Sequence, residues 1–464
     1  MTLKLAKQIC CYLLLSLFFS FKIFAQFNST ILDSSILADM KKASAPGAAM
    51  AVVLNGKIVY QKSFGVGNVF TEKSIDAGNS IFHVASITKT FTALALLKVC
   101  EYKKIDIQQP IGNYINNLSS KQSTITIHQL LSHTSGIVDV WEENNEKSLD
   151  KYFTDMANDG FFDAPGSVFS YSNNGYALAG LLLEKLTGKS YTLAIDSIII
   201  KPLQLKNTLF GFDEVQKRDY VSGHQNNFVV DPVLQAPKDL PAGGLFSTTN
   251  DLIKFAEIFY TNNASTHSFK SVISKMLGNY IYDGTMPEYL GYPDAHYGYG
   301  CINFSYKGIQ FSGHPGEGVS QNTTFAIAPK HNGCIVILSN AGFYPFRNSF
   351  EKAVELFFPI QQSNIIATEP KEITAFEPKD FVGKYIDPKV KTGTSNVMEI
   401  KQEGNQLILL LNETEKIPLE KSGTNKFILK ANVAKFPIEI GFYENKQSKK
   451  VKYLVFYGRV LIKE

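Results

Sequence analysis

Residues 86–97 read Ser-Ile-Thr-Lys-Thr-Phe-Thr-Ala-Leu-Ala-Leu-Leu, and they predict an amphipathic helix that opens on two reactive side chains. The run has apolar residues at helical spacing and contains neither glycine nor proline. Ser86 and Lys89 are three residues apart, so a helix places them on one face. A serine hydroxyl is a weak nucleophile that needs a base, and a lysine in apolar surroundings loses its proton more readily. The pair therefore indicates acyl transfer through a covalent serine ester.

Two further motifs follow in order along the chain, Tyr171-Ser172-Asn173 and His314-Pro315-Gly316. Tyr171 is expected to share a proton with Lys89 and to deliver it to the leaving group, and the base is either Lys89 or a Tyr171 phenolate. Gly316 allows a strand to approach an acylated carbonyl closely. Together the three motifs predict one cleft.

The Ser-x-x-Lys pattern recurs at two other places, so context has to select among them. Ser148 and Lys151 lie in the polar run 142–150, which is typical of a solvated loop, whereas Ser349 and Lys352 follow the other two motifs and break their order. Order and context therefore favour Ser86 as the nucleophile.

Three longer stretches extend the pattern: Ile-His-Gln-Leu-Leu-Ser-His-Thr-Ser-Gly at 127–136, Ser-Tyr-Ser-Asn-Asn-Gly-Tyr at 170–176 and Pro-Ala-Gly-Gly-Leu-Phe-Ser-Thr at 241–248. With these, the chain resembles the serine β-lactamase and penicillin-binding-protein superfamily, in particular its branch of class C β-lactamases, D-alanyl-D-alanine carboxypeptidases and related esterases. The resemblance runs from about Ala45 to about Phe358.

The resemblance implies roles for further residues. Asn173 would hydrogen-bond the acyl-amide side chain of a substrate, and His314 would take the place of the lysine in the family's Lys-Thr-Gly box. The backbone N–H groups of Ser86 and Glu317 would form the oxyanion hole. Pro315 departs from the pattern because it lacks the hydroxyl that helps relatives hold a substrate carboxylate, and Glu317 adds a negative charge there. Both points favour an ester, a neutral amide or an amine-bearing peptide.

The distribution of strand and helix patterns predicts an α+β fold, an antiparallel sheet flanked by helices plus a helical subdomain. The Asn55-Gly56 pair predicts a hairpin, and the region from Ser86 to Phe259 is mostly helical. Strands are expected near both ends of this domain, at Ala48–Leu54, Lys57–Phe64, Gly298–Phe304, Lys307–Ser312, Asn322–Ala328 and Gly333–Ser339, with helices at Ile31–Lys42 and Asn348–Phe357. The sheet would thus combine the two ends of residues 26–360.

A second domain is predicted after a linker at 361–378. Residues 379–464 carry a β-like pattern that predicts a small antiparallel sheet or barrel. Strands are expected at Val397–Lys401, Leu407–Leu411, Phe427–Lys430, Ile438–Tyr443, Tyr453–Tyr457 and Val460–Ile462. The Lys391-Thr392-Gly393 triplet matches the family's box but lies beyond the domain boundary in a turn-like stretch, so we interpret it as a coincidence.

Residues 1–25 predict a cleaved secretory signal peptide, with Lys4 and Lys7 before an apolar stretch from Ile9 to Phe19. The protein is therefore expected to be exported, to the periplasm or the extracellular space, with no stable membrane span after cleavage. Cleavage removes three lysines and no acid, which lowers the formal net charge from +4 to +1 and gives no reason to expect nucleic acid binding.

Three cysteines remain after cleavage, Cys100, Cys301 and Cys334, and their odd number argues against a full disulfide framework. A bridge between Cys301 and Cys334 is left open, because both fall on predicted strands of one sheet. The cysteines and histidines show no zinc-binding spacing, and we expect no metal and no organic cofactor. His133 is expected to fix a loop, and Trp141 either lines the cleft or packs.

These observations predict an exported serine hydrolase that acts on esters, amides or D-amino-acid peptides, its partner being a small-molecule or peptide substrate. One alternative is a class C-like β-lactamase or a D,D-carboxypeptidase. Another is a catalytically weak binding or scaffold protein that has kept the fold. The oligomeric state does not follow from the sequence.

Overall fold

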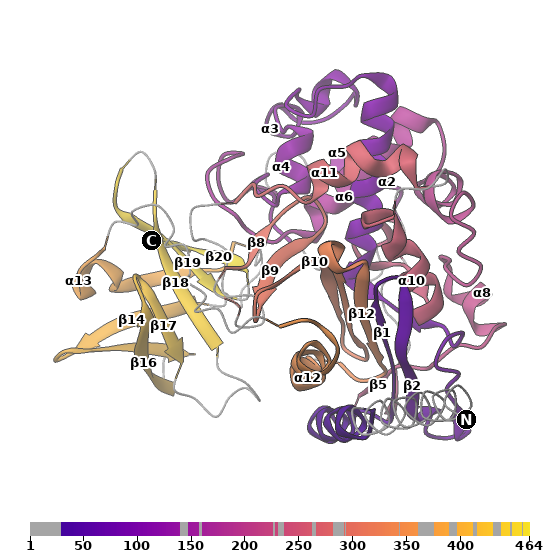
Figure 1. The fold of residues 1–464 in the computed structure, drawn as a ribbon. Helices are drawn as coiled ribbons and strands as arrows, with labels where there is room; N and C mark the ends of the chain where they lie inside the picture. Colours follow the sequence, from indigo (N-terminus) through magenta and orange to yellow (C-terminus); the bar gives the residue numbers. More distant parts are fainter. Residues whose placement is uncertain are drawn as a thin grey trace, which may run out of the picture.

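The computed structural model describes residues 29–139, 147–156, 160–225, 228–230, 236–261, 266–281, 292, 294–342, 344–360, 375–388, 397–411, 415–429, 438–445, 448–456 and 458–464. Figure 1 shows two units, which we call the sheet domain (29–360) and the barrel (375–464). This architecture confirms the predicted α+β fold followed by a small all-β unit.

The sheet domain is organised by an eight-stranded antiparallel sheet in the order β3-β2-β1-β12-β11-β10-β9-β8. The first and last parts of the domain meet at its centre, where β1 pairs with β12, as the sequence predicts. Asn55 and Gly56 form the β1–β2 turn with φ values of 52° and 71°, the left-handed conformation that an Asn-Gly hairpin needs. The strands are β1 (Gly47–Leu54), β2 (Lys57–Asn68), β3 (Lys73–Ser74), β8 (His296–Tyr297), β9 (Ile302–Tyr306), β10 (Ile309–Glu317), β11 (Asn322–Ala328) and β12 (Gly333–Ser339).

Several of these strands differ from the prediction: β3 and β8 were not predicted, and β2 continues to Asn68 instead of ending at Phe64. The stretch 298–301 turns between β8 and β9 instead of forming a strand, and Gly300 has a φ of 67° there. Its Cα lies against the α2 backbone, since a Cβ would be 2.5 Å from the Lys89 carbonyl oxygen. Strand β10 starts later than expected and continues to Glu317, so the whole His314 motif is strand.

The two faces of the sheet bury different sets of side chains, because successive residues of a strand point to opposite sides. Ala49, Ala51 and Val53 of β1 pack with the helical subdomain, whereas the alternate residues pack against the helix over 29–43 and α12 (Arg347–Phe357). Figure 1 shows α12 and the helical subdomain on opposite sides of the sheet.

The central element of the helical subdomain is α2 (Thr88–Lys103), which packs against α6 (Asn173–Thr187). The prediction of an amphipathic helix is wrong here, since almost every residue from Thr88 to Cys100 is buried. The polar residues of its first turn, Thr88, Lys89 and Thr90, are buried as well and have hydrogen-bond partners inside the protein. The other helices are α3 (Ser120–Ser123), α4 (Ile127–Leu131), α5 (Leu149–Met156), α7 (Tyr191–Ile195), α8 (Phe212–Gln216), α9 (Leu240–Gly243), α10 (Thr249–Ala256) and α11 (Lys270–Met276).

The second unit is a closed eight-stranded antiparallel barrel that follows the short helix α13 (Pro378–Phe381). Two of its strands were not predicted: β13 is only four residues long, and β16 carries Pro418 and several charges that obscure the alternation. The strands are β13 (Gly383–Ile386), β14 (Val397–Glu403), β15 (Gln406–Leu411), β16 (Glu415–Gly423), β17 (Lys426–Leu429), β18 (Ile438–Glu444), β19 (Val451–Phe456) and β20 (Arg459–Lys463).

The three cysteines within the described residues, Cys100, Cys301 and Cys334, are buried free thiols. The bridge left open between Cys301 and Cys334 does not form, because Cys334 lies on β12 and Cys301 directly precedes β9, three strand spacings away in the sheet. That separation is roughly 14 Å, twice the reach of a disulfide.

Some predictions concern residues outside the described part of the chain, namely the signal peptide, Trp141 and the Lys391 triplet. Among the helices that the structure does describe, none has the length and apolar character needed to cross a membrane.

Candidate active site

Ser86 lies in a tight turn between a short strand and the buried helix α2. The strand β4 (Phe82–His83) leads into the 3-10 turn η1 (Ala85–Ile87), and α2 follows directly. Ala85 has a φ of 45°, an unfavourable conformation for a residue with a Cβ. The Thr88 hydroxyl holds this turn, donating to the Ala85 carbonyl at 2.6 Å and accepting from the Leu245 N–H at 3.1 Å. Strain of this kind, of order 1–3 kcal/mol, is characteristic of functional sites.

Lys89 is completely buried, and its amine contacts the nucleophile. Its Nζ lies 3.1 Å from Ser86 Oγ, 2.8 Å from Asn173 Oδ1 and 2.7 Å from the Ala242 carbonyl oxygen. The two carbonyl-type oxygens can only accept hydrogen bonds, so they take two N–H groups of Lys89. In a neutral amine, the lone pair is then left for the Ser86 hydroxyl, the one partner that can donate.

Burial favours this neutral form of Lys89. Desolvation lowers its pKa to about 7, opposed by the negative charge of Asp139 and assisted by the positive charge of Arg459. The Lys89 amine is therefore poised to change its charge near neutral pH.

Tyr171 lies directly beside the Lys89 amine and the Ser86 hydroxyl. Lys89 Nζ is 4.8 Å from the centre of the Tyr171 ring, and Ser86 is near enough to affect the pKa of the Tyr171 phenol. Burial raises the pKa of Tyr171 above its ordinary value, so the phenol keeps its proton. Between the two bases that the sequence left open, the geometry and charge favour Lys89.

Asn173 bridges Lys89 to a carboxylate. Its Oδ1 accepts from Lys89, and its Nδ2 donates to Asp139 Oδ2 at 3.1 Å. Both polar atoms thus have protein partners, and one N–H of the amide is left for a substrate. This position gives Asn173 a structural link to Lys89 that the family resemblance does not imply.

The end of β10 closes the site from the sheet side. Gly316 packs against the turn before the nucleophile, where a Cβ would lie 2.2 Å from the Val84 carbonyl oxygen. Pairing with β9 ends at Gly313, so among the described residues His314–Glu317 pairs with β11 alone. The segment therefore presents one free strand edge next to η1.

His314 is buried and held in one orientation. Its Nδ1 lies 2.6 Å from the Pro315 carbonyl oxygen, which only accepts, so Nδ1 carries the proton and Nε2 accepts from the Tyr297 hydroxyl at 3.1 Å. Burial and the nearby charge of Lys89 lower the pKa of His314 to about 3, so the ring is neutral. The lysine of the family's box would be charged at this position, and His314 is not.

Pro315 and Glu317 lie differently from what the sequence comparison assumed. Pro315 shares a small cavity with Phe304 and Phe350 on the α12 face of the sheet, the face opposite the helical subdomain. A hydroxyl-bearing side chain at position 315 would lie on the α12 face as well. The lack of a hydroxyl there is therefore a weaker argument against substrates that carry a carboxylate. Glu317 is exposed at the end of β10.

Sequence reasoning missed Asp139, a buried carboxylate at the start of α6. Oδ1 accepts from the Asn174 N–H at 3.0 Å and from the Ser172 hydroxyl at 3.3 Å, while Oδ2 accepts from Asn173. A carboxylate at a helix N-terminus is stabilised by the helix dipole. No motif marked Asp139, since its role depends on contacts made across the fold.

Sequence reasoning also missed Arg459, which comes from the barrel. Its Nη2 lies 2.9 Å from Asp139 Oδ2. Arg459 follows the β19–β20 turn, and Gly458 in that turn accepts a hydrogen bond from the Tyr171 N–H at 2.7 Å. The barrel therefore contacts the site itself.

The remaining sequence candidates have structural roles. His133 Nδ1 accepts from the Ser172 N–H at 3.0 Å, which fixes the loop as expected. Ser148 accepts from the Lys151 N–H at the start of α5, and the Ser349 hydroxyl donates to Asp39 at 2.7 Å. No group of three or more His, Cys, Asp or Glu side chains within the described ranges is arranged to hold a metal ion.

The site combines a strained serine turn, a buried lysine on the helix that follows, a tyrosine from a neighbouring loop and a free strand edge. These four features define the class of serine hydrolases built on the penicillin-binding fold. The family model described as "Beta-lactamase" matches residues 32–355, and the chain belongs to that family.

Known relatives agree with this placement. The chain is 29% identical over 324 residues to Protein flp of Staphylococcus aureus, a match that covers 67% of this chain and 62% of that protein. It is 24% identical over 312 residues to penicillin-binding protein 4 of Amycolatopsis lactamdurans, covering 64% of this chain and 81% of that protein. The chain thus spans less than two-thirds of the length of the first of these relatives.

Among solved structures, the octameric penicillin-binding protein homologue from Pyrococcus abyssi is 25% identical with a TM-score of 0.64, and the match covers 94% of this chain and 99% of that one. SurE, solved with D-Leu, has a TM-score of 0.74 at 18% identity over 95% of this chain and all of its own. A class C β-lactamase in complex with cefoxitin has a TM-score of 0.63 at 18% identity, over 71% of this chain and 99% of its own. The match to SurE extends over the barrel as well as the sheet domain.

Proposed function

We propose that this protein is an exported serine hydrolase that forms an acyl-enzyme at Ser86 and acts on esters, amides or D-amino-acid peptides. One observation carries the proposal: the fully buried Lys89 amine has two obligate acceptors and a single possible donor, the Ser86 hydroxyl. This arrangement directs the lone pair of a neutral lysine at the nucleophile.

The reaction begins with proton transfer from Ser86 Oγ to Lys89 as Oγ attacks the substrate carbonyl. The backbone N–H groups of Ser86 and Glu317 stabilise the oxyanion. The Tyr171 phenol donates its proton to the leaving group and is reprotonated by the Lys89 ammonium. Water then hydrolyses the ester on Ser86.

The charge around the site supports the proposed substrate class. His314 is neutral where the family's Lys-Thr-Gly box has a lysine, and the Glu317 carboxylate at the end of β10 is near enough to raise the pKa of the Tyr171 phenol. Neutral and amine-bearing acyl donors therefore suit the site better than a donor with a free carboxylate. D-aminoacyl groups belong in the first substrate panel, and SurE was solved with D-Leu.

A class C-like β-lactamase or D,D-carboxypeptidase is the second candidate. The relative named penicillin-binding protein 4 and the cefoxitin-bound class C β-lactamase favour a test with a β-lactam. Export is proposed on the sequence of residues 1–25 alone, and N-terminal sequencing of the secreted protein should find a start at or near Gln26.

The proposal is tested by intact mass after separate incubation with a fluorophosphonate, a fluorescent penicillin and a panel of D-aminoacyl and neutral esters. We expect a single adduct from the fluorophosphonate and faster turnover of neutral esters than of penicillin. Efficient penicillin turnover would favour the second candidate. Absence of any adduct, with the protein folded, would favour a binding or scaffold role.

A further inference from the structure

The tip of one barrel hairpin is built into the wall of the Ser86 site. Three successive residues of this hairpin, Gly458, Arg459 and Val460, each contact the sheet domain. The Gly458 carbonyl accepts from the Tyr171 N–H, Arg459 pairs with Asp139, and the Val460 N–H donates to Ser170 Oγ at 3.3 Å.

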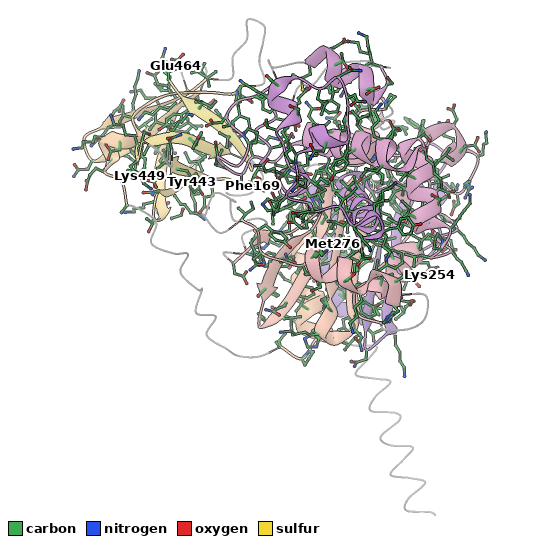
Figure 2. All side chains as sticks on the ribbon, turned by 90° about the horizontal axis from the view of Figure 1, so that it is seen from above. Phe169, Lys254, Met276, Tyr443, Lys449 and Glu464 are labelled. Atoms are coloured by element: carbon green, nitrogen blue, oxygen red, sulfur yellow. The ribbon has the colours of Figure 1, made fainter. Side chains whose placement is uncertain are left out.

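The junction around this tip is extensive. Val168 of the sheet domain packs with a group of barrel side chains, Tyr443, Tyr453, Val455 and Val460. Figure 2 labels Tyr443 of the barrel and Phe169 of the sheet domain on the two sides of this junction. A second ion pair, between Lys452 and Asp163 at 2.8 Å, lies at the same junction and, within the described part of the chain, is not bonded to Lys89, Asn173 or Asp139.

The two ion pairs differ in their carboxylates, because Asp139, the partner of Arg459, also accepts hydrogen bonds from residues of the active site. Asp139 is only 4% exposed and accepts from the side chains of Ser172 and Asn173 and from the Asn174 N–H. Asn173 in turn accepts from Lys89. A chain of polar contacts thus runs from the barrel to the amine beside the nucleophile.

We propose that Arg459, supplied by the barrel, is a positioning residue of the Ser86 site: it neutralises Asp139 and thereby holds Asn173 and the Lys89 amine in the state that accepts the serine proton. This inference rests on the proposed function, and it assigns the barrel a role in the reaction. A buried carboxylate without its cation would attract the Lys89 proton and oppose the neutral amine.

The pH dependence of acylation provides a readout that a merely structural contact would not move. The titratable groups facing Lys89 or its polar neighbours are Asp139, Arg459, Tyr171, Tyr176, His133, His314 and Glu317. Both histidines have lowered pKa values and both tyrosines raised ones, so their charges do not change near neutral pH. Desolvation raises the pKa of Glu317, so a Glu317→Gln variant is needed to separate its titration from that of Lys89 in the fall of rate at low pH.

Arg459→Met in the full chain is the decisive variant. The acid limb of Ser86 acylation by a neutral ester should move to higher pH by about one unit. With a wild-type pKa of about 7, the neutral fraction at pH 7 falls from about one-half to about one-tenth, roughly a five-fold loss of rate. Arg459→Lys keeps the charge and should restore most of the profile.

Lys452→Met is the matched control, because it removes the other ion pair of the junction without touching Asp139. Its pH profile should match wild type, and melting curves of both variants show whether the junction is intact. The inference is overturned if Arg459→Met leaves the limb in place, or if Lys452→Met moves it equally. If the wild-type protein is not acylated at all, the proposed function fails instead.

Discussion

The two sides of the active site are held together in different ways. Ser86 lies in the turn η1 and Lys89 three residues on in the first turn of α2, so local helical geometry keeps their side chains together. Arg459 and Asp139 are 320 positions apart in the sequence and meet only when the barrel packs on the sheet domain. The local pair supplies the reacting groups, while the distant pair adjusts their charge. Loss of the Ser86–Lys89 pair should abolish the reaction, whereas loss of the Arg459–Asp139 pair should only shift the pH range in which the reaction proceeds.

The largest effect is expected at the nucleophile. Ser86→Ala should abolish covalent labelling by a fluorophosphonate, because no other hydroxyl has the Lys89 amine as a partner among the described residues. The fold should persist, since the removed hydroxyl is part of the cleft rather than the core. Intact mass measures the adduct directly.

Ser148→Ala is the control for that variant, as it removes the serine of the second Ser-x-x-Lys pattern. Ser148 caps α5, so the change costs at most about 1 kcal/mol and should leave labelling unchanged. Labelling of Ser86→Ala at the wild-type rate would place the nucleophile elsewhere.

A large but incomplete loss is expected at the base. Lys89→Met keeps most of the side-chain volume and removes the amine, so ester turnover should fall by at least ~10²-fold. The change also leaves Asn173 Oδ1 and the Ala242 carbonyl without their donor, so circular dichroism should accompany the kinetics. Turnover within a few-fold of wild type in a folded variant would show that Lys89 is not the base.

A smaller loss, about ten-fold in kcat/KM, is expected where β10 meets the nucleophile turn. Gly316→Ala would place a Cβ 2.2 Å from the Val84 carbonyl oxygen, which forces the strand and the turn apart. Overpacking of this kind costs about 1–3 kcal/mol of stability. Gly318→Ala is the control, because its Cβ would meet its nearest neighbour at an ordinary 3.6 Å. Equal activity of the two variants would argue against a close approach at Gly316.

The smallest effect is expected at the carboxylate of the distant pair. Asp139 raises the pKa of Lys89, so Asp139→Asn should lower that pKa and move the acid limb of acylation to lower pH. This shift is opposite in sign to the one expected for Arg459→Met. A shift to higher pH would mean that Asp139 acts by holding the geometry of Asn173 rather than by its charge.

The same contrast explains what the sequence could predict. Strands β11 and β12 were predicted with their observed ends, since each contains an apolar run, Phe325–Ala328 and Cys334–Leu338, and a turn at Pro329–His331 separates them. Motif order placed six residues in one site, and the structure brings them together. They are Ser86, Lys89, Tyr171, Asn173, His314 and Gly316. Local spacing and ordered motifs were sufficient for these.

Other features depended on contacts that no local pattern records. The burial of α2 on all sides follows from its place between the sheet and α6. Asp139 and Arg459 each look like ordinary charged residues, and only the docking of the barrel turns them into neighbours. Pro315 points to the α12 face of the sheet because alternate residues of β10 face opposite sides. Only the register of the strand shows which side each residue faces.

The pH dependence of Ser86 acylation by a neutral ester tests the central claim most directly. The amine must be neutral to accept the serine proton, and burial lowers its pKa to about 7. The rate should therefore be at its plateau above that pH, half-maximal near it, and fall progressively as the pH drops further, with the effect lost in Lys89→Met. A rate that stays constant from about pH 5 to 9 in the wild-type protein would contradict a Lys89 base.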